Sequence, residues 1–228
     1  MNAETNFETE TKKDLYYAVH KGIRLASARM LIALGQADAS DESSVMEVLG
    51  KLSAHLDLSL GHLTHENDKI HAVVDARVPG ASDHQGEDHD HHLESFSELR
   101  RLAEEVAMAG ADRAAKLRRL YQRFALFVAD DLTHMHEEET ELMPLVAANF
   151  SGAEIEGIEH SIVSAIAPEK MVAFLKVMLG AASRSERVGM VSGMRQAMPQ
   201  AAFDGLFAAV VGPDWQMGDW EAMEQRLC

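Results

Sequence analysis

The sequence predicts an all-α protein: an up-down-up-down four-helix bundle followed by an additional C-terminal set of shorter helices. Apolar residues recur at helical spacing through four long segments of the first 150 residues. No segment shows sustained alternation of apolar and polar residues, which is the pattern of a half-buried strand. Because short connections join the four long segments, each helix is expected to run antiparallel to the one before it.

The first two predicted helices run from Asp14 to Gly35 and from Asp41 to the stop at Pro79. Leu15, Val19 and Ile23 set the apolar period of the first helix. Asp41 is typical of an N-cap residue, since its carboxylate can accept a backbone N–H of the first helical turn. A polar loop is expected over residues 80–88.

The third predicted helix follows that loop and ends near Gly110, and the fourth runs from about Asp112 to Pro144 or just past it. Phe96 in the third helix and Phe124 in the fourth belong to their apolar stripes. Proline lacks a backbone N–H, so Pro144 marks a kink or a boundary of the fourth helix.

The predicted organisation has three parts. Residues 1–11 are expected to be disordered, residues 12–150 to form the bundle, and residues 151–228 to form a helical extension. The extension is dense in methionine, which fills irregular gaps between short helices. Its methionines are therefore interpreted as core filler, with a groove for a protein partner as the alternative.

Composition limits the partners and the compartment. The formal net charge of −16 disfavours binding to nucleic acid. The single cysteine, Cys228, cannot form an internal disulfide, which is typical of a reducing compartment. The chain starts with a polar, acidic segment unlike a signal peptide, and no apolar stretch approaches the roughly 20 residues that span a bilayer. We therefore expect a cytoplasmic protein that does not bind membranes.

Two pairs of histidine and glutamate are the main candidate metal ligands. His62 and Glu66 are four residues apart, as are His134 and Glu138, so each pair shares one face of its helix. Neutral imidazole binds iron or zinc, and a carboxylate can bridge two metal ions. Two helices that each present such a pair suggest a two-metal site inside a bundle.

Further histidines lie on the other two helices. His20 is close to the apolar face of the first helix, and His89 and His92, three residues apart, share a face of the third. The pairs and these histidines together spread the candidate ligands over four helices.

These residues resemble the motifs of the hemerythrin-like, or HHE cation-binding, proteins over roughly residues 12–148. The resemblance implies a non-haem di-iron centre, with two iron ions held by five histidines and two carboxylates inside a four-helix bundle. It assigns Glu66 and Glu138 as bridging ligands. The terminal ligands that it implies are His20, His62, His89, His92 and His134. Zinc or manganese could also accept these ligands.

Two spacings depart from the oxygen-carrying members of that family. In those members the paired histidines of the third helix are four residues apart, whereas His89 and His92 are three apart, so one of the two is a candidate non-ligand. They also place the last carboxylate five residues after the histidine, which selects Glu139 as the alternative to Glu138.

The other histidines are expected to play no direct part. Those predicted on exposed faces or in the loop are His65, His71, His84, His91 and His136. His55 is expected in the core or behind the ligands, and His160 in a structural or surface position. Tyr16 is expected to serve packing, with tuning of the metal site by its hydroxyl as the alternative.

The expected function is a non-enzymatic di-iron protein that binds or senses oxygen, reactive oxygen or nitrogen species, or iron itself. Its small ligands would be O2, peroxide or nitric oxide, and the C-terminal helices could bind a protein partner. The first alternative is a di-iron enzyme acting on peroxide or nitric oxide, or an iron donor in iron–sulfur cluster repair. The second is a metal-free helical interaction module.

Overall fold

The computed structural model describes residues 12–228, and these residues form helices and no strand. The predicted disorder of residues 1–11 lies outside the described residues. Four long helices make up the first part of the chain: α1 (Tyr17–Gln36), α2 (Glu42–His65), α4 (Asp83–Ala107) and α5 (Arg113–Glu137). The all-α prediction is confirmed for the part of the chain that the structure describes.

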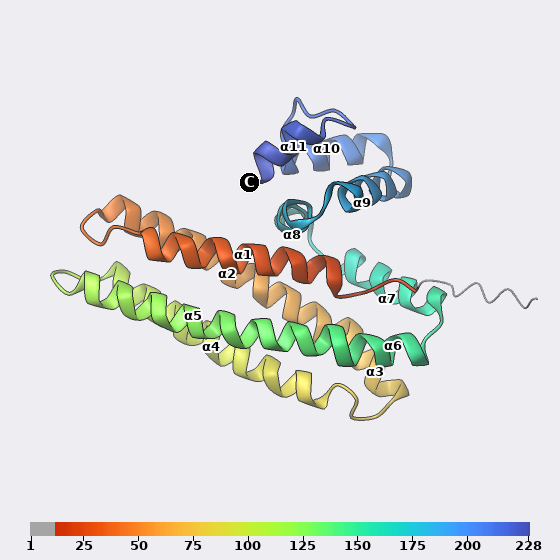
Figure 1. The fold of residues 1–228 in the computed structure, drawn as a ribbon, viewed down its shortest axis with the longest axis horizontal. Coiled ribbons are helices and arrows are strands. Elements are labelled where there is room, and N and C mark those ends of the chain that lie inside the picture. The colour runs from red at the N-terminus through yellow and green to blue at the C-terminus, as the bar shows by residue number, and fades with distance from the viewer. Residues whose placement is uncertain (1–11) are drawn as a thin grey trace, which may run out of the picture.

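The four long helices pack side by side and alternate in direction along the chain (Figure 1). Helix α1 contacts α2 and α5, and α4 contacts the same two helices, so the four enclose one core. The expected bundle of long helices followed by shorter ones is therefore observed. Among the described helices, none combines the length and the apolarity needed to cross a bilayer.

Two of the long helices continue through a wider, π-helical turn. Helix α2 passes through η1 (Glu66–His71) into α3 (Ala72–Arg77). Helix α5 passes through η2 (Glu138–Leu142) into α6 (Met143–Asn149). Pro144, which lacks the N–H that an α-helix would use, lies in the first turn of α6 directly after η2. The irregularity expected near Pro144 is thus a π turn, a feature frequent at functional sites.

The prediction of a loop over residues 80–88 is wrong for most of that range, because α4 already begins at Asp83. Its first turns bury Gln85, His89 and His92, which recur at helical spacing. These residues are polar, so the segment has a buried helical face without an apolar stripe. Ser82 precedes the helix and binds the carboxylate of Asp75 through its backbone N–H and its hydroxyl.

Two apolar clusters occupy the bundle. The larger one includes Leu52, Leu99 and Phe124. The second, toward α3, α6 and the helix that follows them, α7 (Gly152–Ala165), includes Tyr16, Ile70, Val74, Leu142, Val146 and Ile155. Along α1 and along the continuous helices α2–η1 and α5–η2, the His and Glu candidates lie at the boundary between the two clusters, so they form a polar layer with apolar packing on both sides.

The C-terminal helices are α7 (Gly152–Ala165), α8 (Pro168–Ala181), α9 (Arg184–Ala197), α10 (Gln200–Val210) and α11 (Trp220–Leu227). A third apolar cluster around Phe203 and Phe207 holds α8 to α11 together. The methionines that pack against it are Met171, Met190, Met194, Met198 and Met217. Their interpretation as core filler is confirmed.

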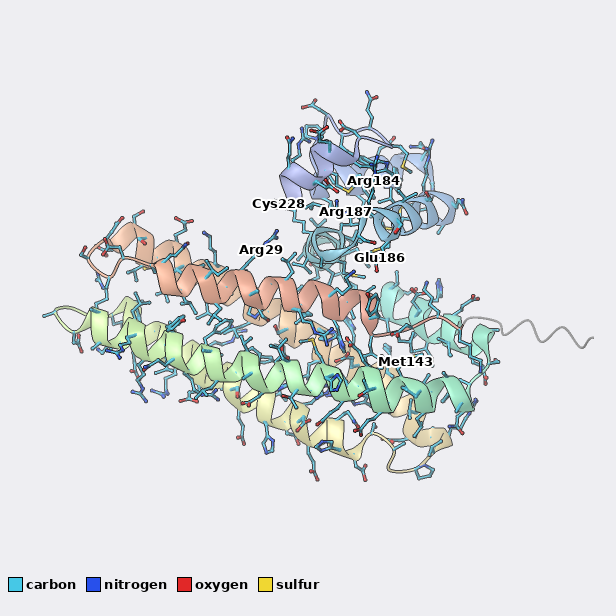
Figure 2. The ribbon with its side chains drawn as sticks, viewed as in Figure 1. Arg29, Met143, Arg184, Glu186, Arg187 and Cys228 are labelled. Carbon is cyan, nitrogen blue, oxygen red and sulfur yellow. The ribbon has the colours of Figure 1, made fainter. Side chains whose placement is uncertain are left out.

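Helix α8 attaches this C-terminal group to α1 (Figure 1). A side chain at Gly22 would place its Cβ 3.0 Å from the backbone nitrogen of Met178, so the two helices approach closely there. Lys21 donates to Glu186 at 2.7 Å, and Arg29 donates to the carbonyl of Leu227 at 2.6 Å. In Figure 2, Arg29 and Glu186 lie on either side of α8, where the C-terminal helices meet the bundle.

Candidate metal centre

The polar layer brings together side chains from α1, α2, α4 and α5 and from both π turns. Its innermost members are His20, His62, Glu66, His71, His89, His134 and Glu138. The helical pairs His62–Glu66 and His134–Glu138 face inward, as the spacing of four residues predicts.

The carboxylate of Glu66 is surrounded by imidazoles on both of its oxygens. Its Oε1 atom lies 3.4 Å from Nε2 of His20 and 3.3 Å from Nε2 of His62. Its Oε2 atom lies 3.6 Å from Nε2 of His89. The two oxygens thus face histidines of different helices, which is the disposition that a bridging carboxylate requires.

Glu138 occupies the equivalent position on the opposite side. Its Oε2 atom lies 3.3 Å from Nε2 of His20 and 3.4 Å from Nε2 of His134. Its Oε1 atom lies 3.5 Å from Nε2 of His71 and 3.8 Å from Nε2 of His89. Glu138 is completely buried and contacts histidines on both of its oxygens.

Several inward-facing atoms lack a hydrogen-bond partner among the described residues. They are Oε2 of Glu66, both carboxylate oxygens of Glu138 and Nε2 of His71. A buried polar atom without a partner costs about 1–3 kcal/mol, and more when it is charged. The layer therefore has donor atoms that the protein itself leaves unsatisfied, and a cation would satisfy them.

Outer hydrogen bonds fix the orientation of three histidines. Nδ1 of His20 lies 3.0 Å from Oε1 of Glu139, and Nδ1 of His89 lies 2.7 Å from Oδ1 of Asn67. Nδ1 of His134 lies 3.3 Å from Oδ2 of Asp88. Each outer oxygen can hold the Nδ1–H tautomer, which leaves Nε2 as the inward lone pair. This is the usual arrangement of histidines that bind metals.

A negative charge on Glu138 disfavours a negative charge on Glu66, the other buried carboxylate. Burial, together with the negative charge of Glu138, raises the pKa of Glu66 to about 8. Burial lowers the pKa of His20, but hydrogen bonding to Glu138 and Glu139 outweighs it and leaves that pKa well above its usual range. Protons bound in the layer thus neutralise part of the negative charge of the carboxylates. Binding of a cation would displace these protons.

Three other histidines are held neutral. Burial lowers the pKa of His62 well below its usual range, that of His89 to about 3 and that of His92 to about 4. A neutral imidazole is the form that binds a metal. These side chains are therefore already in the protonation state that coordination requires.

His71 was predicted on an exposed face, and that prediction is wrong. Its side chain is buried, and its ring stacks on that of His89 with centroids 5.0 Å apart. In an α-helix His71, five residues after Glu66, would point elsewhere, because five residues make about 1.4 turns. The π turn η1 spans this interval and brings both side chains to one face. The α-helical period of the apolar residues does not predict this position of His71.

The sequence left two choices of ligand open, Glu138 or Glu139 and His89 or His92, and the members of each pair differ in their surroundings. Glu138 lies inside the layer, whereas Glu139 is partly exposed and accepts a hydrogen bond from Arg24 at 2.6 Å. His89 lies inside the layer, whereas His92 lies behind His134, with the ring centroids 5.0 Å apart. Glu139 and His92 thus occupy outer positions.

The remaining histidines mostly follow the sequence prediction. His84, His91 and His136 are exposed, and His55 is buried in the larger apolar cluster against Phe124. His65 is partly buried, so its predicted exposure is only approximate.

Two further polar side chains are buried beside the layer. Tyr16 is fully buried with its ring centroid 5.3 Å from that of His20, and its hydroxyl has no hydrogen-bond partner among the described residues. Burial raises the pKa of Asp131 to about 7, with the charge of Glu138 adding to the effect. The burial of Tyr16 beside His20 is compatible with both of its predicted roles, packing and tuning of the metal site, whereas Asp131 was not predicted.

The donor set fits metal ions. Two groups of buried ligand atoms lie within 4.8 Å of one another: one from Glu66, His89, His134 and Glu138, the other from His20, His62 and Glu66. Both groups contain Glu66, whose two oxygens point to different histidines. Imidazole nitrogen and carboxylate oxygen together suit iron, zinc or manganese. The buried His and Glu clusters can therefore hold metal ions.

Comparison with known proteins adds no assignment. No protein-family model matches the sequence, and no curated protein matches it at the threshold applied. The residues and the geometry of the centre are therefore the basis for assigning a function.

Proposed function

We propose that this protein is a hemerythrin-like, non-haem di-iron protein that binds or senses oxygen, reactive oxygen or nitrogen species, or iron. The observation that carries this proposal is the pair of buried carboxylates, Glu66 and Glu138, with unsatisfied oxygens inside a ring of imidazoles. The resemblance of the His and Glu motifs to the hemerythrin-like family supports iron as the metal.

In this proposal Glu66 and Glu138 would hold the two iron ions as shared carboxylate ligands. The terminal ligands are drawn from His20, His62, His89 and His134, with His71 as an addition that the π turn provides. His92 is the sequence-derived ligand with least support, because it lies outside both groups of close donor atoms. It is assigned here to a supporting position beside His134.

Two iron ions would supply the redox chemistry needed to bind O2, peroxide or nitric oxide reversibly. The chain supports such binding with apolar packing on both sides of the polar layer, which limits access of water. The unpartnered Tyr16 hydroxyl is available to donate a hydrogen bond toward the layer. Glu139, Asn67 and Asp88 keep the histidine rings oriented.

Anaerobic reconstitution with ferrous iron tests the proposal. The wild-type chain is expected to retain about two iron ions after desalting, because two bridging carboxylates define a two-metal site. The double variant Glu66→Gln/Glu138→Gln keeps the side-chain volume but removes both charges, and should retain little iron. Less than one iron ion in the wild-type chain, or equal retention by the variant, would count against the proposal.

Asp131 favours a second candidate, a di-iron enzyme that reduces peroxide or nitric oxide. Such a reduction consumes electrons, which an external one-electron donor would have to supply, and protons, of which a buried carboxyl with a pKa of about 7 can supply one at neutral pH. Rapid multiple turnover in the presence of such a donor, lost in Asp131→Asn, would support the enzyme. Stoichiometric binding without turnover would support the binding or sensing protein.

A further inference from the structure

A second group of possible ligands lies on the surface of the bundle, outside the buried layer. His84, Asp88 and Glu137 each offer one ligand atom, and these atoms lie within 4.8 Å of one another. Nε2 of His84 lies 3.0 Å from a carboxylate oxygen of Glu137 and 3.9 Å from Oδ2 of Asp88. The side chain of His84 is 60 % exposed, so an ion could reach this group directly from solvent.

These three residues line a cavity of about 520 Å³ that also reaches His92 and His134. His92 is only 6 % exposed, and its ring forms no hydrogen bond with another residue of the described range. A buried imidazole that faces a cavity without a partner is an available ligand, independent of the surface group. The cavity therefore has possible cation ligands at its surface and at its inner wall.

The charge of the cavity also favours cations. Among the described residues that line it, Arg123 is the only arginine or lysine, and it binds Glu98 at 2.6 Å and also donates to Ser95. The other carboxylates of its lining, Asp88, Glu94, Asp130 and Glu137, leave a negative excess. A cleft lined by one sign of charge concentrates ions of the opposite sign and speeds their association.

Asp88 connects the surface group to the buried layer. The same Oδ2 atom that lies 3.9 Å from His84 lies 3.3 Å from Nδ1 of His134. Nε2 of His134 in turn lies 3.4 Å from Glu138. One side chain thus separates the exposed group from a histidine of the candidate centre.

We propose that His84, Asp88 and Glu137 form an entry site that captures a divalent metal ion and passes it through the cavity, past His92, to the buried layer. The capture step is independent of the proposed function, whereas the delivery step rests on it. An ordinary surface ion pair between His84 and Glu137 is the alternative, and such pairs contribute little to stability. The two steps are tested separately.

Capture is tested with Zn²⁺, by NMR of the histidine side chains, on the metal-free full-length Glu66→Gln/Glu138→Gln chain, whose buried layer should retain little metal. Substoichiometric Zn²⁺ is diamagnetic and should shift the signals of His84 strongly in this chain and much less when Glu137→Gln is added. His91, which lines the same cavity outside the group of three, serves as the internal reference. Equal shifts of His84 in the two proteins would overturn the entry site whatever the buried layer of the wild type binds.

Delivery is tested with Co²⁺, whose visible absorption reports occupation of an imidazole and carboxylate site. At low ionic strength His84→Ala/Glu137→Gln should load about tenfold more slowly than the wild type, with the same final cobalt content. His91→Ala should load at the wild-type rate. A wild-type loading rate in the double variant would overturn delivery. A lower final cobalt content in the double variant would also overturn it, because these residues would then belong to the centre itself. A wild-type chain that takes up no cobalt would refute the proposed function, while the Zn²⁺ result would still decide capture.

Discussion

Nε2 of His71 lies 3.5 Å from Oε1 of Glu138, and this contact joins the two π turns of the bundle. His71 ends η1 and Glu138 begins η2, so each residue stands at the edge of an irregular turn. Both atoms lack hydrogen bonds to other described residues. The contact suggests that the π turns serve to bring donor atoms into one layer, because regular α-helices would not place His71 there.

The first prediction concerns His71. Replacing His71 with alanine should weaken iron binding, since it removes one of the inward-facing nitrogens. Iron affinity measured by competition with a chelator should fall by about tenfold or more, as for removal of groups that support a metal site.

The matched control is His136→Ala, because His136 is exposed and lies two residues before Glu138. Its iron affinity should equal that of the wild type. Circular dichroism of both metal-free variants would show whether the helices remain. An intact His71→Ala protein with wild-type affinity would remove His71 from the centre.

The second prediction separates Glu138 from Glu139. Glu138→Gln should cause the larger loss of bound iron, because Glu138 is buried among the imidazoles. Glu139→Gln should cost only about 10- to 100-fold in affinity, because Glu139 orients His20 from outside. Metal analysis after equilibrium dialysis would check this order. The reverse order would identify Glu139 as the ligand.

The third prediction concerns pH. His55 is buried against Phe124, its two nitrogens have no hydrogen-bond partner among the described residues, and burial lowers its pKa to about 4. The unfolded chain should take up this proton near pH 6.5, whereas the folded chain resists it until about pH 4. The free energy of unfolding therefore falls as pH falls through this window, by at most about 1.4 kcal/mol per pH unit for this residue.

His55→Leu should remove this dependence and also the cost of two unsatisfied nitrogens. The variant is expected to be more stable than the wild type by about 1–3 kcal/mol near neutral pH. The advantage should grow as pH falls from about 6.5 toward about 4. Urea denaturation of both metal-free proteins across this range gives the difference. A constant or shrinking difference would contradict the account of His55.

The fourth prediction concerns the contact between α1 and α8. Gly22→Ala should destabilise the protein by about 1–3 kcal/mol, because the new Cβ would meet the backbone of α8. Gly50→Ala in α2 is the control, since no atom lies within 4 Å of its added Cβ. That change should stabilise by about 0.5–1 kcal/mol through helix propensity. Similar effects of the two substitutions on the free energy of unfolding in urea would show that the close approach of α1 and α8 does not limit the side chain at Gly22.

Regular helical spacing was enough to predict the bundle and the inward-facing pairs. His62 and Glu66, and likewise His134 and Glu138, share a helix face because four residues make about 1.1 turns. The same reasoning predicted His55 in the core or behind the ligands, and the residue is buried in the core. Local periodicity therefore gave much of the fold and the pairs at the heart of the layer.

The remaining features depend on departures from that periodicity or on tertiary contacts. His71 required a π turn, which is specified by packing around η1 and not by an apolar repeat. The start of α4 was missed because its buried face is polar. The contact of Asp88 with His134 could not be predicted, because it depends on how α4 packs against α5.

The most direct test of the central claim is X-ray diffraction from crystals of the iron-reconstituted protein, recorded above and below the iron absorption edge. The account predicts two iron peaks inside the polar layer, each close to a different oxygen of Glu66 and Glu138. A well-ordered layer without iron peaks, or iron only at sites away from both carboxylates, would contradict it.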